Sequence, residues 1–109
     1  MDIKEIVVLI TAPSADVAEG ISNTLLDREL AACANIVPSI RSIYKWKGEV
    51  HNDEEVLIII KTRHELFDDA FINAVKEHHP YEVPEIIALP IVLGSEDYLQ
   101  WITEVTKAN

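Results

Sequence analysis

Two histidines and two glutamates lie within eight residues of one another in the second half of the sequence: His78, His79, Glu82 and Glu85. Imidazole and carboxylate groups are ligands for borderline divalent ions such as copper or zinc. Their spacing matches no strong metal motif such as HExxH. A second interpretation is that both histidines lie in the last turn of a helix, where they interact favourably with the helix dipole. On the residue types alone, we prefer this second interpretation.

Cys33 is the only cysteine of the chain. A thiolate is a soft metal ligand, but a lone cysteine in the apolar segment Leu30–Ala34 is more often a small buried hydrophobic residue. The fold predicted below puts Cys33 and His79 at opposite ends of a sheet. One chain therefore cannot use both residues for the same ion, and a site that uses both needs different protomers.

Nucleophilic catalysis has little support in this sequence. No Ser-His-Asp or Cys-His pair can be placed, and with 3 glycines there is no phosphate-binding loop. We therefore expect that the protein is not an enzyme. The basic residues group near Tyr44 and Trp46, where they either contact an anion or protect a sheet edge against aggregation: Arg41, Lys45, Lys47, Lys61 and Arg63.

The 109 residues are 49% hydrophobic and 26% charged, and they predict one globular domain that spans residues 1–109. The net charge of −10 repels phosphate and anionic lipid, so we expect neither a nucleic-acid nor a membrane partner. The start of the sequence does not fit a signal peptide. A single cysteine forms no disulfide within the chain, and we expect a cytoplasmic protein.

Hydrophobic periodicity and capping signals predict a definite order of elements. They are a strand at 3–11, a helix at 15–30 capped by Ser14, a long strand at 33–46, a hairpin loop at 47–53, a strand at 54–62, a helix that begins at a capping box on Thr62 and ends before Pro80, a strand at 85–93, and a last helix around 98–105. This is the α+β, ferredoxin-like βαββαβ pattern with an antiparallel sheet of order 4-1-3-2 and an added C-terminal helix. Pro38 and Pro90 fall in the two strands that this order puts at the edges.

The strand at 33–46 is much longer than the usual 5–6 residues. Its apolar side chains fall on both faces, and one layer of two helices covers only one face. A homo-oligomer that pairs these strands between protomers would cover the rest. The alternative is a monomer with a protruding hairpin.

Four segments resemble the CutA family of divalent-cation tolerance proteins: Leu30–Pro38, Ser42–Gly48, Lys61–Thr62 and His79–Ile86. The resemblance implies a cytoplasmic homotrimer of ferredoxin-like subunits that are packed through the long second and third strands. It also implies binding of divalent copper and a role in divalent cation tolerance and the response to metal ions. The family's proposed metal ligands correspond to Cys33 and His79 here.

Two functions are therefore expected. The first is weak to moderate copper binding through His79, Glu82 and Glu85 with help from His78, while Cys33 contributes at a separate place. The alternative is a trimeric module that senses or signals a small ligand in a cleft between subunits, lined by Tyr44, Trp46, Lys61 and Tyr81.

Overall fold

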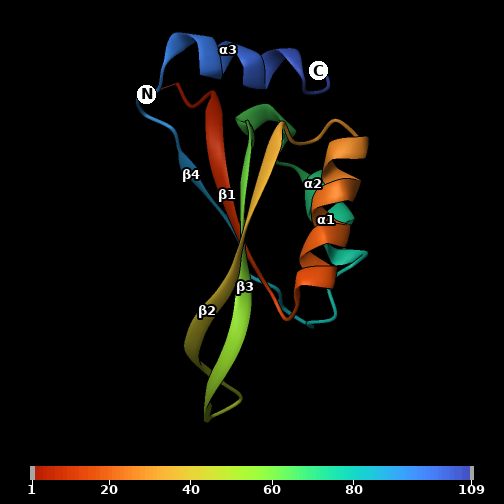
Figure 1. Cartoon of the computed structure of the whole chain (residues 1–109), viewed down its shortest axis with the longest axis vertical. Coiled ribbons are helices and arrows are strands. Elements are labelled where there is room, and N and C mark those ends of the chain that lie inside the picture. Colours follow the sequence, from red (N-terminus) through yellow and green to blue (C-terminus); the bar gives the residue numbers. More distant parts are fainter. Residues whose placement is uncertain (1, 109) are drawn as a thin grey trace.

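The computed structural model describes residues 2–108, which form one antiparallel sheet with two helices packed on one of its faces (Figure 1). The elements are β1 (Glu5–Ala12), α1 (Ala15–Asp27), β2 (Cys33–Trp46), β3 (Glu49–Arg63), a 3₁₀ turn (His64–Leu66), α2 (Asp69–Lys76), β4 (Ile86–Pro90) and α3 (Glu96–Glu104). Within residues 2–108, no helix is long and apolar enough to cross a membrane.

The strand order is β2-β3-β1-β4, which is the predicted order 4-1-3-2 counted from the other edge. All pairs are antiparallel, so the ferredoxin-like prediction is confirmed. The two edge strands are the ones that carry prolines. Pro38 lies at a register shift between Val37 and Ile40 in β2, and Pro90 is the last residue of β4. Neither proline therefore removes an amide donor from the middle of a regular ladder.

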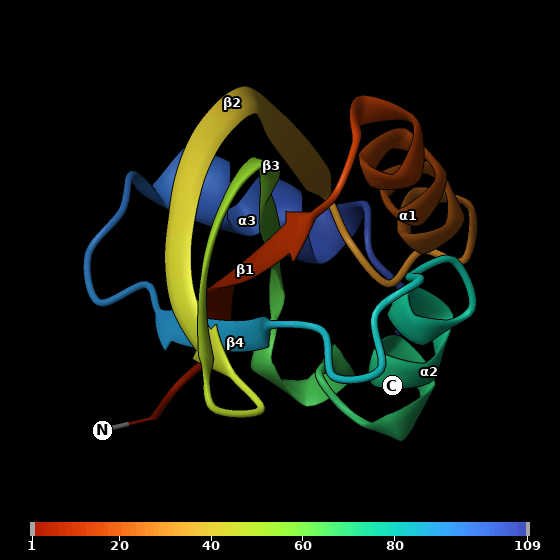
Figure 2. The same ribbon diagram turned by 90° about the horizontal axis from the view of Figure 1, so that it is seen from below.

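Successive side chains of the central strands point to opposite faces of the sheet, so one face is buried and the other is not. Ile6, Val8 and Ile10 of β1 are buried under the helices, together with Ile58 and Ile60 of β3. The helices supply the opposite half of the core, which consists of Ala18, Ile21, Leu25, Phe71, Ala74 and Val75. Figure 2 shows α1 and α2 together on one side of the sheet, whereas α3 crosses one end of it (Figure 1).

The other sheet face carries apolar side chains as well. Leu9 lies between Ile59 and Ile87 in the register, and Val7 lies beside Leu89. This surface, which we call the open face, consists of Val7, Leu9, Leu57, Ile59, Ile87 and Leu89. Ile87 and Leu89 are 51% and 53% exposed, because α1 and α2 both pack on the opposite face.

The predicted capping box at Thr62 is wrong. Thr62 still belongs to β3, and its hydroxyl donates a hydrogen bond to the Leu30 carbonyl, 2.6 Å away. The helix begins after the 3₁₀ turn, where the Asp68 side chain accepts hydrogen bonds from the backbone of Ala70 and Phe71. The Thr62 hydroxyl therefore binds the distant Leu30 carbonyl, although the local sequence pattern predicted that it caps a helix.

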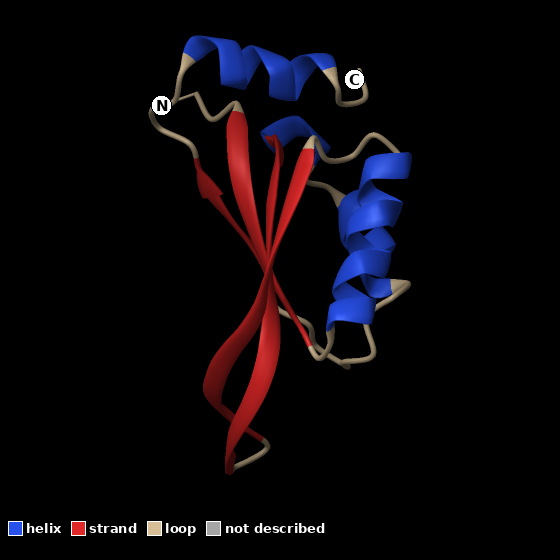
Figure 3. Cartoon of the chain, in the orientation of Figure 1, coloured by secondary structure: helices blue, strands red, loops and turns tan. Residues whose placement is uncertain are grey.

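The hairpin between β2 and β3 also differs from the prediction. The predicted loop at 47–53 is a turn of two residues, Lys47 and Gly48, which both have positive φ (50° and 81°). Such turns match the twist of the flanking strands. Residues 49–53 consequently continue β3, and the hairpin extends beyond the helical layer (Figure 3). Ile43 and Trp46 of β2 are exposed in the single chain, and the predicted covering of β2 by a second protomer stays a prediction.

Smaller differences concern the ends of the elements. The helix predicted at 15–30 ends at Asp27, although Ser14 caps it as expected by accepting a hydrogen bond from the Val17 amide. The strand predicted at 85–93 covers Ile86–Pro90, since only these residues pair with β1.

Candidate functional site

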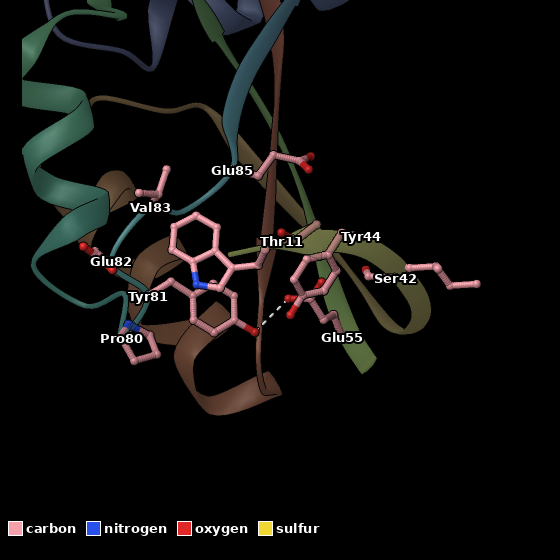
Figure 4. Close-up of a pocket in the computed structure, with 11 residues that line it drawn as sticks. Thr11, Ser42, Tyr44, Glu55, Pro80, Tyr81, Glu82, Val83 and Glu85 are labelled. Atoms are coloured by element: carbon pink, nitrogen blue, oxygen red, sulfur yellow. Dashed lines mark hydrogen bonds between the residues drawn. The ribbon is translucent and has the colours of Figure 1, made fainter. Parts of the chain in front are cut away.

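A pocket of about 640 Å³ lies where the open face continues onto the outer half of the hairpin. One wall comes from β2 and β3, and the other comes from the segment 80–85 that connects α2 to β4 (Figure 4). The pocket is lined by Thr11, Ser42, Ile43, Tyr44, Trp46, Glu55, Pro80, Tyr81, Glu82, Val83 and Glu85. Three of the four residues predicted for a cleft, Tyr44, Trp46 and Tyr81, are therefore brought together.

His79 holds the segment 80–85 in place. Its ring is buried, and its Nε2 donates a hydrogen bond to the Thr11 carbonyl oxygen, 2.7 Å away. Its Nδ1 accepts one from the backbone N–H of Tyr81 at 3.3 Å. Both ring nitrogens are thus used to attach the segment to the end of β1, and this attachment sets the position of Tyr81 in the pocket.

Two tyrosines bind carboxylates of β3 in the pocket wall. The Tyr81 hydroxyl donates to Glu55 Oε2 at 2.8 Å, and the Tyr44 hydroxyl donates to Asp53 Oδ2 at 2.6 Å. Figure 4 shows the Glu55 carboxylate between the two tyrosines. Burial, followed by the hydrogen bond to Glu55, raises the pKa of Tyr81, and the hydrogen bond to Asp53 raises that of Tyr44. Both hydroxyls remain neutral donors, and their rings are held in fixed positions.

Trp46, Lys47 and Glu82 form a contact at the rim of the pocket. The Lys47 ammonium lies 5.6 Å from the centre of the Trp46 ring and 3.7 Å from a carboxylate oxygen of Glu82. Among the described lining residues are the carboxylates of Glu55, Glu82 and Glu85 and no basic side chain. The pocket therefore combines aromatic surface with negative charge.

The five predicted metal ligands do not gather in one chain. His78 is hydrogen-bonded to Thr24 of α1 at 2.8 Å, His79 uses both ring nitrogens, and Glu82 contacts Lys47. Within residues 2–108, no group of three or more histidine, cysteine or acidic side chains is arranged to hold a metal ion. The convergence expected for His79, Glu82 and Glu85 is absent because the imidazole is buried as an anchor.

Cys33 lies away from His79, as its place in the topology predicted. It pairs with Lys61, whereas Thr11, which binds His79, pairs with Leu57. Four residues along a strand correspond to about 13 Å. The Cys33 thiol lies near Tyr98 and Asn35.

Lys61, which was predicted for a cleft between subunits, is not among the residues that line this pocket of one chain and pairs with Cys33. Its ammonium donates to the Asn35 side chain instead. Glu55, which does line the pocket, was missed. The signal was the alternation of β3, which puts Glu55 and Asp53 on the same face as Leu57.

The βαββαβ sheet, its long hairpin and the added C-terminal helix define a small ferredoxin-like domain with an acidic, aromatic pocket. The family model described as "CutA1 divalent ion tolerance protein" matches residues 6–105, and the chain belongs to this family. It is 51% identical to the divalent-cation tolerance protein CutA of Thermus thermophilus over 94% of this chain and 98% of that protein.

Two plant proteins are also similar. The chain is 44% identical to the chloroplastic protein CutA of Arabidopsis thaliana over 96% of its length, but it spans only 57% of that protein. The crystal structure of CutA1 from Oryza sativa superimposes with a TM-score of 0.91 at 44% identity, and the match covers 98% of this chain and 97% of that one.

Proposed function

We propose that this chain acts in the cytoplasm as a homotrimer that binds divalent cations, copper in particular, and thereby contributes to divalent cation tolerance. Relatives named for divalent-cation tolerance at up to 51% identity support the general role. The net charge of −10 supports attraction of cations. A single free thiol suits a reducing compartment. In this proposal the protein works by binding and not by catalysis.

The open face is the observation that supports an oligomer. Contiguous apolar side chains on a sheet face mark an interaction surface. A second copy of the chain would cover Leu9, Ile59 and Ile87 and would also pair with the exposed hairpin. The number three comes from the family resemblance. Sedimentation at low concentration should give about 37 kDa, three times the chain mass of 12.3 kDa. A mass near 12 kDa would contradict the trimer.

Copper binding needs a separate test, because the side chains of residues 2–108 form no group of three or more metal ligands. The exposed carboxylates Glu82 and Glu85 give a weak to moderate site, and His79 joins it only by giving up the hydrogen bond from Tyr81. Calorimetric titration of the trimer with copper(II) should show binding that decreases in the Glu82→Gln, Glu85→Gln double variant. Binding that is lost in Cys33→Ser and unchanged in His79→Ala would refute this arrangement.

The pocket favours a second candidate function, a trimeric module that senses a small ligand. Its volume of about 640 Å³ lies within the range of small-molecule sites, and its aromatic wall is typical of them. Titrations of the same trimer with copper(II) and with small ligands distinguish the two candidates. Binding of small ligands without copper binding would favour the sensing module.

A further inference from the structure

We propose that the pocket between the hairpin and the segment 80–85 binds a small organic ammonium ion. The cation's charge would lie among the carboxylates, and its alkyl groups would lie against the aromatic rings. This inference rests on the second candidate function above and assigns its ligand class. It does not depend on copper binding.

The pocket lining carries negative charge that is spread over three carboxylates. Glu55, Glu82 and Glu85 line the pocket without a basic partner among its described lining residues. Among the described residues 2–108, these three carboxylates do not form a group that could hold a metal ion. Negative charge that is spread over separate carboxylates holds a compact metal ion only weakly, because tight binding requires several ligands close together, but it attracts a large, weakly hydrated organic cation. The charge therefore favours an ammonium ion that carries carbon substituents.

The pocket lining also carries aromatic surface. The Tyr44 hydroxyl donates a hydrogen bond to Asp53, and the Tyr81 hydroxyl donates one to Glu55. Each ring is therefore held in place before a ligand binds. The Tyr44 ring is also stacked on His51 at 5.2 Å, and the Tyr81 ring lies 4.7 Å from that of His79. Fixed rings lose little conformational entropy on binding. Aromatic faces attract ammonium groups, most strongly when the ring is an indole.

The chain already holds an ammonium group at this place. The Lys47 Nζ lies over the Trp46 ring and beside the Glu82 carboxylate. An ammonium ligand from solution would require the same two contacts, one with an aromatic face and one with a carboxylate. Lys47 is exposed at the tip of the hairpin, so its side chain can leave. It therefore competes with the ligand at the pocket rim.

The experiment uses the trimer with Trp101→Phe, which leaves Trp46 as the only indole. The Trp46 indole N–H signal is followed by NMR during titration with tetramethylammonium, and with tert-butanol as the neutral molecule of similar shape. We expect saturable shifts with the cation only. Equal binding of tert-butanol, or no shift with the cation, would overturn the proposal.

Two variants test the contacts in opposite directions. Trp46→Leu should weaken binding of tetramethylammonium by about 2- to 30-fold, the range of a cation–π contact. Lys47→Gln should strengthen it by about 2- to 10-fold, because it removes the internal competitor. Lys45→Gln is the matched control, since this exposed lysine changes the net charge equally. If Lys47→Gln and Lys45→Gln strengthen binding equally, the effect is one of net charge and the rim contact is refuted.

The same samples distinguish ligand binding in the pocket from disassembly of the trimer and from binding of a protein partner. Sedimentation of each variant shows whether the trimer is intact, so a loss of binding through disassembly is recognised directly. Lys47→Gln lies at an exposed turn and gives a result even if Trp46→Leu does not assemble. A trimethyllysine peptide that binds more tightly than tetramethylammonium would overturn the assignment to a free small molecule and indicate a protein partner.

Discussion

Replacing Ile87 and Leu89 by serine should dissociate the proposed trimer. Both side chains are about half exposed in one chain, at 51% and 53%. Full burial of such a side chain is worth about 1.5–3 kcal/mol, so burial of the exposed half is worth roughly 1 kcal/mol each. Two side chains in each of three subunits amount to about 6 kcal/mol per trimer. The trimer dissociation constant should then rise by about 10⁴-fold.

Sedimentation velocity over a range of protein concentrations measures this change. The far-UV circular dichroism of the variant should stay unchanged, because both residues lie on the face away from the core. Leu26→Ser is the matched control, since Leu26 is 39% exposed on α1 and lies off the open face. A double variant that remains trimeric at the same concentrations as Leu26→Ser would show that β4 takes no part in assembly.

Three further predictions concern stability. Phe71→Ala removes a fully buried ring from the core and should cost about 3–5 kcal/mol in the free energy of unfolding, measured by denaturant titration. Thr62→Val removes the hydroxyl that donates to Leu30 and should cost about 1–3 kcal/mol by the same measurement; no change would show that this bond does not stabilise the fold. The pKa of Tyr81 is raised in the folded state by burial and by Glu55, so stability should fall as the pH rises above about 10, the ordinary tyrosine value. Tyr81→Phe should reduce this fall, which unfolding curves at pH 9 and pH 11 will show.

The topology was predictable because it depends on the polarity of whole segments. The bounds of β2 and the edge position of Pro38 followed from composition and from the missing amide donor. The start of α2 was not predictable, because the Thr62 hydroxyl bonds to Leu30, which lies 32 residues earlier in the chain. The polar residues Asn52 and Asp53 suggested a loop, but they pair with Ile43 and Ser42 in a strand that lies outside the core.

The pocket was only partly predictable from the sequence. Tyr44 and Trp46 were recognised from their place on the long strand, and Tyr81 from the segment that follows His79. Glu55 was missed although the alternation of β3 puts it on the same face as Leu57, and only its cross-strand partner, Ile40, depends on the bulge at Pro38. His79 was predicted as a metal ligand on chemical type, and this stays a prediction; in the single chain its buried ring is hydrogen-bonded to the Thr11 carbonyl. Chemical type alone does not show whether an imidazole faces solvent or backbone.

The open face and the pocket belong to one continuous surface, and the proposed assembly and the proposed ligand binding therefore involve neighbouring residues. Thr11 and Leu57 form the pair at which the apolar rows of the open face end and the pocket begins. Beyond this pair, the same face of β3 carries Glu55 and then Asp53. A subunit that covers the apolar rows would therefore lie next to the mouth of the pocket. The long hairpin thus has two roles in the proposed trimer, since its β2 edge pairs with a neighbour while its open face forms the pocket wall.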